Sequence, residues 1–128
     1  MESYPDIEIY LARGDIARLD AWLAEAIGAA ALTPTGKRQW RTRGGKDPAS
    51  VPVLLVEKAA DGFASLWFDS PETPWATDAE CARDAARWLE CEVRCSLGGW
   101  QPGDDPDRFL QVLPDGTEQP IDWPDSGQ

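Results

Sequence analysis

The chain has 128 residues, a length typical of one domain, and 42% of them are apolar. Its 23 acidic and 12 basic residues give a formal charge of −11, which disfavours indiscriminate binding to nucleic acid or to an anionic membrane. The sequence contains no histidine, and this excludes Ser–His and Cys–His nucleophile pairs and histidine metal ligands. We expect a single acidic domain over residues 1–128 with no cofactor. Its acidic residues show no recognisable pairing of the kind that would indicate an enzyme.

Strand and helix patterns alternate along the first half of the chain. Asp15 can cap a helix that carries its apolar residues on one face, and Thr33-Pro34-Thr35-Gly36 is expected to end that helix. The segment 51–58 is apolar on both faces, which predicts a central strand, and Asp61-Gly62 is typical of a hairpin turn after it. The strands predicted from these patterns are 6–12, 37–43, 51–58 and 63–69.

A capping box begins the second half. Thr77 and Glu80 have the spacing that satisfies the first amides of a helix, and apolar residues continue at helical spacing to Leu89. A final hairpin is predicted around the turn at 114–117. The predicted strands of this half are 90–97, 108–113 and 118–123.

The predicted order of elements is β-α-β-β-β-α-β-β. Two right-handed strand–helix–strand crossovers would place both helices on one face of a mixed β-sheet. The predicted class is therefore α+β, and the topology resembles a variant of the ferredoxin-like sandwich with extra strands. This resemblance is one of topology only and implies no function, because folds of this kind carry many unrelated activities.

The three cysteines are predicted to lie in the core. Cys91 and Cys95 are four apart on a predicted strand, so they share a face with Val93 and Leu97, and Cys81 lies on the apolar stripe of the preceding helix. No CxxC motif and no fourth soft ligand accompanies them. These features favour core packing over a metal or redox site.

The segment 37–46 holds five of the twelve basic residues and no acid, so the rest of the chain carries −16. It is either an edge strand whose positive charge resists aggregation or a contact for an anionic ligand, with Trp40 stacking on a ring. We favour the edge strand and do not expect nucleic acid as a partner, since the surrounding charge repels a polyanion. Alternation places Lys37, Gln39, Arg41 and Arg43 on one face, and Arg38, Trp40 and Thr42 on the other.

Seven tryptophans are several times the usual abundance. Trp22 and Trp88 fall on the core faces of the predicted helices and Trp67 falls within a strand, so packing accounts for them. Trp75 and Trp100 fall in loops rich in Pro and Gly. They either form an aromatic patch at an interface or close the ends of the core, and both interpretations stay open.

The location is inferred from four further features. No secretion signal and no apolar run near the ~20 residues that span a bilayer is present. An odd number of cysteines fits a reducing compartment, and the excess of Arg over Lys is typical of a GC-rich bacterial genome. We expect a cytoplasmic bacterial protein without a membrane partner.

These patterns favour a non-catalytic interaction or regulatory protein over an enzyme. Its acidity would suit inhibition of a basic protein, as immunity proteins inhibit toxins, and the partner could equally be a second copy of the chain. The alternative is a binder of an anionic ligand or nucleic acid through strand 37–46. The candidate surface comprises Arg38, Trp40, Arg41, Arg43, Trp75 and Trp100.

Overall fold

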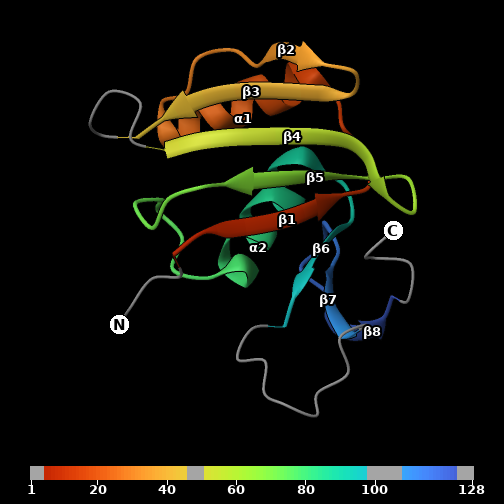
Figure 1. Cartoon of the computed structure of the whole chain (residues 1–128). Coiled ribbons are helices and arrows are strands. Elements are labelled where there is room, and N and C mark those ends of the chain that lie inside the picture. Colours follow the sequence, from red (N-terminus) through yellow and green to blue (C-terminus); the bar gives the residue numbers. More distant parts are fainter. Residues whose placement is uncertain (1–4, 46–50, 98–107, 124–128) are drawn as a thin grey trace.

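The computed structural model describes residues 5–45, 51–97 and 108–123. It contains two helices and one eight-stranded sheet, which confirms the α+β class (Figure 1). The elements are β1 (Ile7–Leu11), α1 (Ile16–Ile27), β2 (Thr33–Gly36), β3 (Gln39–Gly44), β4 (Val51–Ala60), β5 (Phe63–Phe68), α2 (Asp78–Leu89), β6 (Val93–Ser96), β7 (Arg108–Val112) and β8 (Glu118–Asp122).

The strands lie in the order β2-β3-β4-β5-β1-β6-β7-β8. Helix α2 leads from β5 to β6 past β1, and α1 leads from β1 to β2 at the edge of the sheet. Both crossovers are right-handed, and both helices lie behind the sheet in Figure 1. The four strands β6-β1-β5-β4 have the order of a ferredoxin-like sheet, with β2 and β3 added on one side and β7 and β8 on the other.

Two details of the sheet differ from the expectation. Every neighbouring pair of strands is antiparallel, so the sheet is not mixed. Each helical crossover passes at least one other strand, and parallel strands therefore never become neighbours. The predicted order of elements has only two strands after the second helix. The structure has three there, β6, β7 and β8, and they correspond to the three strand segments predicted individually.

A further correction concerns β2. Helix α1 ends at Ile27, where Gly28 adopts the left-handed conformation of a C-cap with φ 63°. The segment 33–36 is therefore a strand and not the end of the helix. All four of its residues are exposed and one is proline, so no burial pattern indicates a strand there. Because β2 pairs with β3, the basic strand is not the edge of the sheet.

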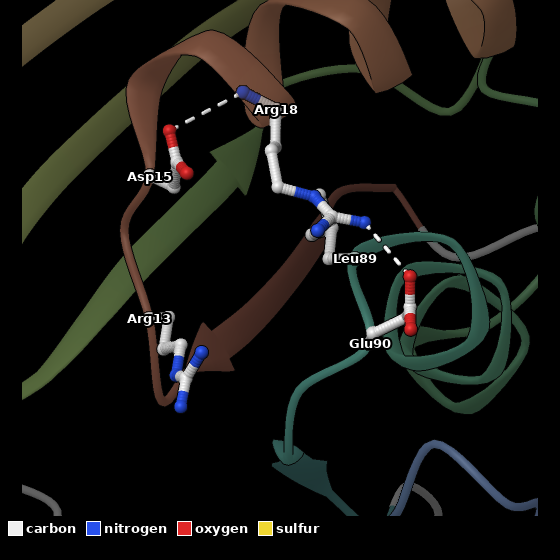
Figure 2. Close-up of a pocket in the computed structure, with 5 residues that line it drawn as sticks. All are labelled: Arg13, Asp15, Arg18, Leu89 and Glu90. Atoms are coloured by element: carbon white, nitrogen blue, oxygen red, sulfur yellow. Dashed lines mark hydrogen bonds and ion pairs between the residues drawn. The ribbon is translucent and has the colours of Figure 1, made fainter.

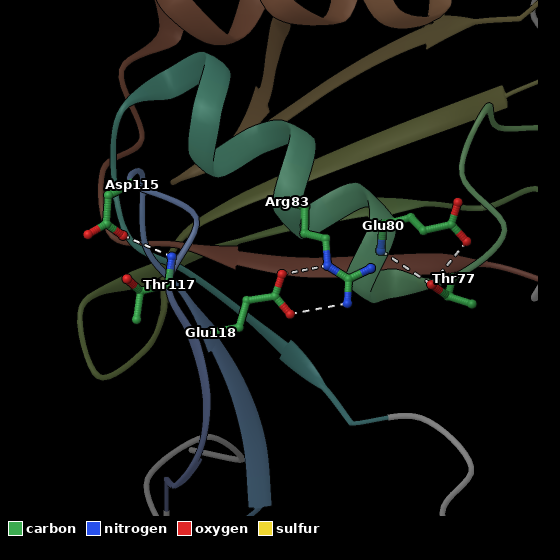
Figure 3. A network of polar contacts seen from close by, with 6 residues as sticks. All are labelled: Thr77, Glu80, Arg83, Asp115, Thr117 and Glu118. Carbon is green, nitrogen blue, oxygen red and sulfur yellow. Dashed lines mark hydrogen bonds and ion pairs between the residues drawn. The ribbon is translucent and has the colours of Figure 1, made fainter.

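Both predicted helix caps are present. The Asp15 carboxylate accepts hydrogen bonds from the amides of Ala17 (3.1 Å) and Arg18 (3.5 Å), the second of which is drawn in Figure 2. The Thr77 hydroxyl accepts from the Glu80 amide at 3.2 Å and donates to the Glu80 carboxylate at 3.4 Å (Figure 3). These side chains satisfy first-turn amides of α1 and α2.

The main core lies between the helices and the sheet. Cys81 and Cys95 are fully buried in it and Cys91 is 6% exposed, so the predicted burial of all three thiols is confirmed. Burial raises the pKa of each thiol above its usual value. Leu97 was expected on the same buried face but is 47% exposed, because β6 ends one residue earlier at Ser96.

Candidate functional site

The face of the sheet opposite the helices looks toward the viewer in Figure 1, and no helix of the described residues covers it. The strand register brings four residues into one row across this face, and they come from β3, β4, β5 and β1. The row consists of Arg41, Leu54, Trp67 and Glu8.

One half of this face is covered by an aromatic cluster, and we call it the closed half. Trp123 follows β8 and is 3% exposed. Its ring centroid lies 5.2 Å from Tyr10, 5.0 Å from Phe63 and 5.2 Å from Phe109. The Arg94 guanidinium stacks 4.5 Å from the Phe63 ring and 4.7 Å from the Trp123 ring. This half is therefore a small second core with aromatic and cation–π contacts.

The other half, which we call the open half, has no such cover among the described residues. Pro52, Leu54 and Val56 of β4 and Trp67 of β5 are half-buried there. The Trp67 indole donates to the Asp6 carboxylate at 2.8 Å, which fixes the ring against the face. The antiparallel sheet thus presents apolar side chains on a face that usually carries polar ones.

Charges of opposite sign border the open half. Arg41 is exposed on β3 and makes no ion pair with the described residues. Glu8 on β1 accepts hydrogen bonds from the hydroxyls of Ser65 (2.7 Å) and Tyr10 (3.4 Å), and within the described ranges it has no ion pair either. Burial, with the Glu8 carboxylate beside it, raises the pKa of Tyr10 to about 12.

The residues of the predicted surface are dispersed. Arg38 lies in the exposed turn between β2 and β3 with φ 63°, while Arg41 and Arg43 project from the open face as alternation predicted. Trp40 points to the helix side, packs against the core and donates to Glu57 at 2.8 Å. Its ring is therefore not on the same face as the arginines.

Among the described residues, the loop tryptophans do not form an exposed aromatic patch. Trp75 is 5% exposed, with its ring centroid 5.4 Å from Trp22 and 5.2 Å from Phe68, and its indole donates to Asp84 at 3.1 Å. It closes the end of the main core, which is one of the two interpretations left open by the sequence. Trp100 lies outside the described residues.

Sequence reasoning missed the apolar centre of the open half. Segment 51–58 was interpreted as a central strand that is apolar on both faces, and Trp67 was assigned to packing. The burial of β4 alternates strictly from Val51 to Val56, so one face of this strand is only half-buried. No local pattern distinguishes a strand face that another layer covers from one that stays open.

Several hollows lie along this face and beside the helices. One of about 270 Å³ is lined by Asp6, Glu8, Tyr10 and Asp78 among others. Asp78 accepts from the Glu8 amide and the Ser96 hydroxyl, each at 3.3 Å, and burial raises its pKa to about 6. No group of three or more Cys, Asp or Glu among the described residues could hold a metal ion.

A second pocket of about 230 Å³ lies between the beginning of α1 and the end of α2 (Figure 2). Arg18 and Glu90 pair across it at 3.1 Å, and Arg13 and Asp15 complete its charged wall. Opposite charges are therefore equal in number in its lining. A third hollow, of about 330 Å³, is lined in part by Arg83 and Glu118, which form a bidentate pair at 2.6 and 3.1 Å (Figure 3).

Among the described residues, no helix combines the length and the apolar character needed to cross a bilayer. Comparison of the chain with protein-family models, curated protein sequences and solved structures gave no significant match. The open half of the sheet, with its apolar centre and its two charged borders, is therefore the candidate functional site on geometric grounds alone.

Proposed function

We propose that this protein is a non-catalytic interaction domain that binds another protein through the open half of its sheet. The observation that carries the proposal is the row from Arg41 through Leu54 and Trp67 to Glu8. It combines an apolar centre with a positive border on one side and a negative border on the other. A regulatory or inhibitory role is a form of the same function and differs only in the partner.

Two physical arguments support a protein as the partner. Tryptophan and arginine are the residues that most often dominate binding energy at protein interfaces, and here both stand on rigid strands. An apolar centre with a polar rim is also the usual anatomy of such interfaces. The open half occupies only part of one sheet face and is smaller than a standard interface side, so the expected complex is transient.

A nucleic-acid partner is less well supported. Trp40 packs toward the helices and cannot stack on a base beside Arg41 and Arg43. The negative border formed by Asp6 and Glu8 lies on the same face. A phosphate backbone that followed the arginines across this face would meet these carboxylates.

The proposal is tested with a charge placed in the apolar centre. Leu54→Asp leaves the main core intact, because Leu54 lies on the face opposite the helices. Leu97→Asp is the matched control, since Leu97 is 47% exposed and outside the open half. Tagged wild type and both variants are used to isolate partners from the source cells, and each protein identified by mass spectrometry is purified and titrated.

We expect Leu54→Asp to weaken the binding of a genuine partner by at least about tenfold, and Leu97→Asp to leave it within about twofold. Circular dichroism verifies that both variants remain folded. If the same purified partner binds all three proteins equally, the open half is not the contact surface.

A further inference from the structure

We infer that the partner of the open half is a second copy of this chain, packed face to face about a two-fold axis. This inference rests on the proposed function and names the partner. The axis lies parallel to the strands, between β4 and β5. Closed two-fold dimers are the commonest oligomers, and their interfaces must be complementary to themselves.

The central row has this self-complementarity. Arg41 pairs with Leu54, Leu54 with Trp67 and Trp67 with Glu8 in consecutive strand pairs. Rotation about the proposed axis reverses the order of the strands and keeps the position along them. Arg41 of one copy then faces Glu8 of the other, and Leu54 faces Trp67, with both contacts made twice.

The neighbouring row obeys the same symmetry. Gln39, Val56, Ser65 and Tyr10 are in register across the same four strands. The rotation places the neutral Gln39 opposite Tyr10, whose ring packs against Trp123 at the border with the closed half. Val56 faces the small Ser65. The neighbouring rows of the two copies therefore come together without placing like charges opposite each other.

Distances explain why the charges are left for a partner. Arg41 and Glu8 are three strand spacings apart in one chain, roughly 14 Å, with Leu54 and Trp67 between them. Packed sheets lie about 10 Å apart, a gap that an Arg and a Glu side chain span together. Each charge therefore finds its opposite more readily across the dimer than within the monomer.

The axis also keeps most of the closed half away from the central row of the contact. It places β2 of one copy opposite β6 of the other, so β7 and β8 fall beyond the partner's edge strand. Most of the Trp123 cluster lies toward that side, on β1, β6 and β7, and its remaining member, Phe63, stands at the first residue of β5. The closed half thus limits the interface without blocking it.

Two terms limit the strength of this dimer. Its contact area is small, and each copy carries −11. At physiological ionic strength the repulsion between distant charges is screened beyond about 8 Å, whereas the Arg41–Glu8 contacts are shorter. We expect a dissociation constant in the micromolar range.

The test uses sedimentation velocity over a concentration series of the full chain. Arg41→Glu opposes two carboxylates at each end of the row, and Glu8→Lys opposes two cations. Each variant alone should dimerise at least about tenfold more weakly than wild type. An equimolar mixture of the two should recover dimers, because the introduced carboxylate of one chain then faces the introduced ammonium of the other. The second contact of that mixed dimer is the original one, between Glu8 of the first chain and Arg41 of the second.

Arg87→Glu is the control for net charge, since Arg87 is exposed on α2 behind the sheet and should leave dimerisation unchanged. If Glu8→Lys does not fold, Glu8→Gln takes its place, and its mixture with Arg41→Glu should still associate more strongly than Arg41→Glu alone. A wild type that stays monomeric throughout, or a mixture that recovers nothing, overturns the inference. If the chain is a monomer but still binds another purified protein through Leu54, the dimer inference is wrong and the proposed function stands. If it neither dimerises nor binds another protein through Leu54, both the inference and the proposed function are wrong.

Discussion

The two halves of the helix-free face of the sheet differ in one respect, which is whether a distant segment returns to cover them. In the closed half, Trp123 comes back from the end of β8 and packs on Tyr10 and Phe63. In the open half, Leu54 and Trp67 have the same kind of apolar surface without such a segment among the described residues. Covered apolar groups contribute to stability, whereas uncovered ones are available for binding.

The largest expected effect comes from the tryptophans of the two halves. Trp123→Ala removes a ring that is 3% exposed, and we expect a loss of about 3–5 kcal/mol in the free energy of unfolding. Trp67→Ala should cost less than about 2 kcal/mol, because its ring is half-buried. Urea denaturation measures both, and similar losses would mean that the halves are equally covered.

Trp123→Phe sharpens this result. The Trp123 indole nitrogen is buried without a hydrogen-bond partner among the described residues. Phenylalanine keeps much of the ring contact and removes that unsatisfied donor, which itself costs free energy when buried. The loss should therefore be well below that of Trp123→Ala, and an equal loss would contradict the packing argument.

The arginines of the two halves provide the second comparison. Arg94 stacks on two rings and pairs with Glu92 at 2.8 Å, with 17% of its side chain exposed. Arg94→Gln should lower the free energy of unfolding by about 2 kcal/mol, since it removes a partly desolvated cation–π contact and an ion pair. Arg41→Gln should change it by less than about 0.5 kcal/mol. Thermal and urea unfolding would show whether this order is reversed.

A smaller, pH-dependent effect is expected at Asp78, in the hollow beside the closed half. Burial raises the pKa of Asp78 from 3.8 unfolded to about 6 folded, so its favourable contribution is complete below pH 3.8 and is lost as the pH rises through about 6. Asparagine cannot ionise, so Asp78→Asn removes the loss of stability that accompanies ionisation of this buried carboxyl. We expect it to stabilise the protein by about 1 kcal/mol at pH 7.5, once partial exposure is discounted, and to have no effect near pH 4.

Urea denaturation of wild type and Asp78→Asn at the two pH values measures this difference. The asparagine carbonyl oxygen can still accept from the Glu8 amide, and its NH2 group, which replaces the second carboxylate oxygen, can donate to the Ser96 hydroxyl oxygen, so both contacts can be kept. An equal effect at both pH values would show that the charge of Asp78 is not responsible.

Local sequence determined the parts of this protein that depend on neighbouring residues. Asp15 and Thr77 cap amides two or three positions away, and the helices follow from an apolar spacing within single turns. Burial of the three thiols followed from the same periodicities. The α+β class was predictable for this reason, since element type is a short-range property.

The tertiary structure alone decided which surfaces are covered. Trp75 is buried because Trp22 and Phe68 meet it from other elements, and Trp40 faces away from the arginines because β3 packs against α1 on that side. The strand β2 exists because β3 supplies its partners. The same alternation of apolar residues produced a closed half and an open half, because coverage of a sheet face depends on contacts between segments far apart in the chain, which periodicity does not encode.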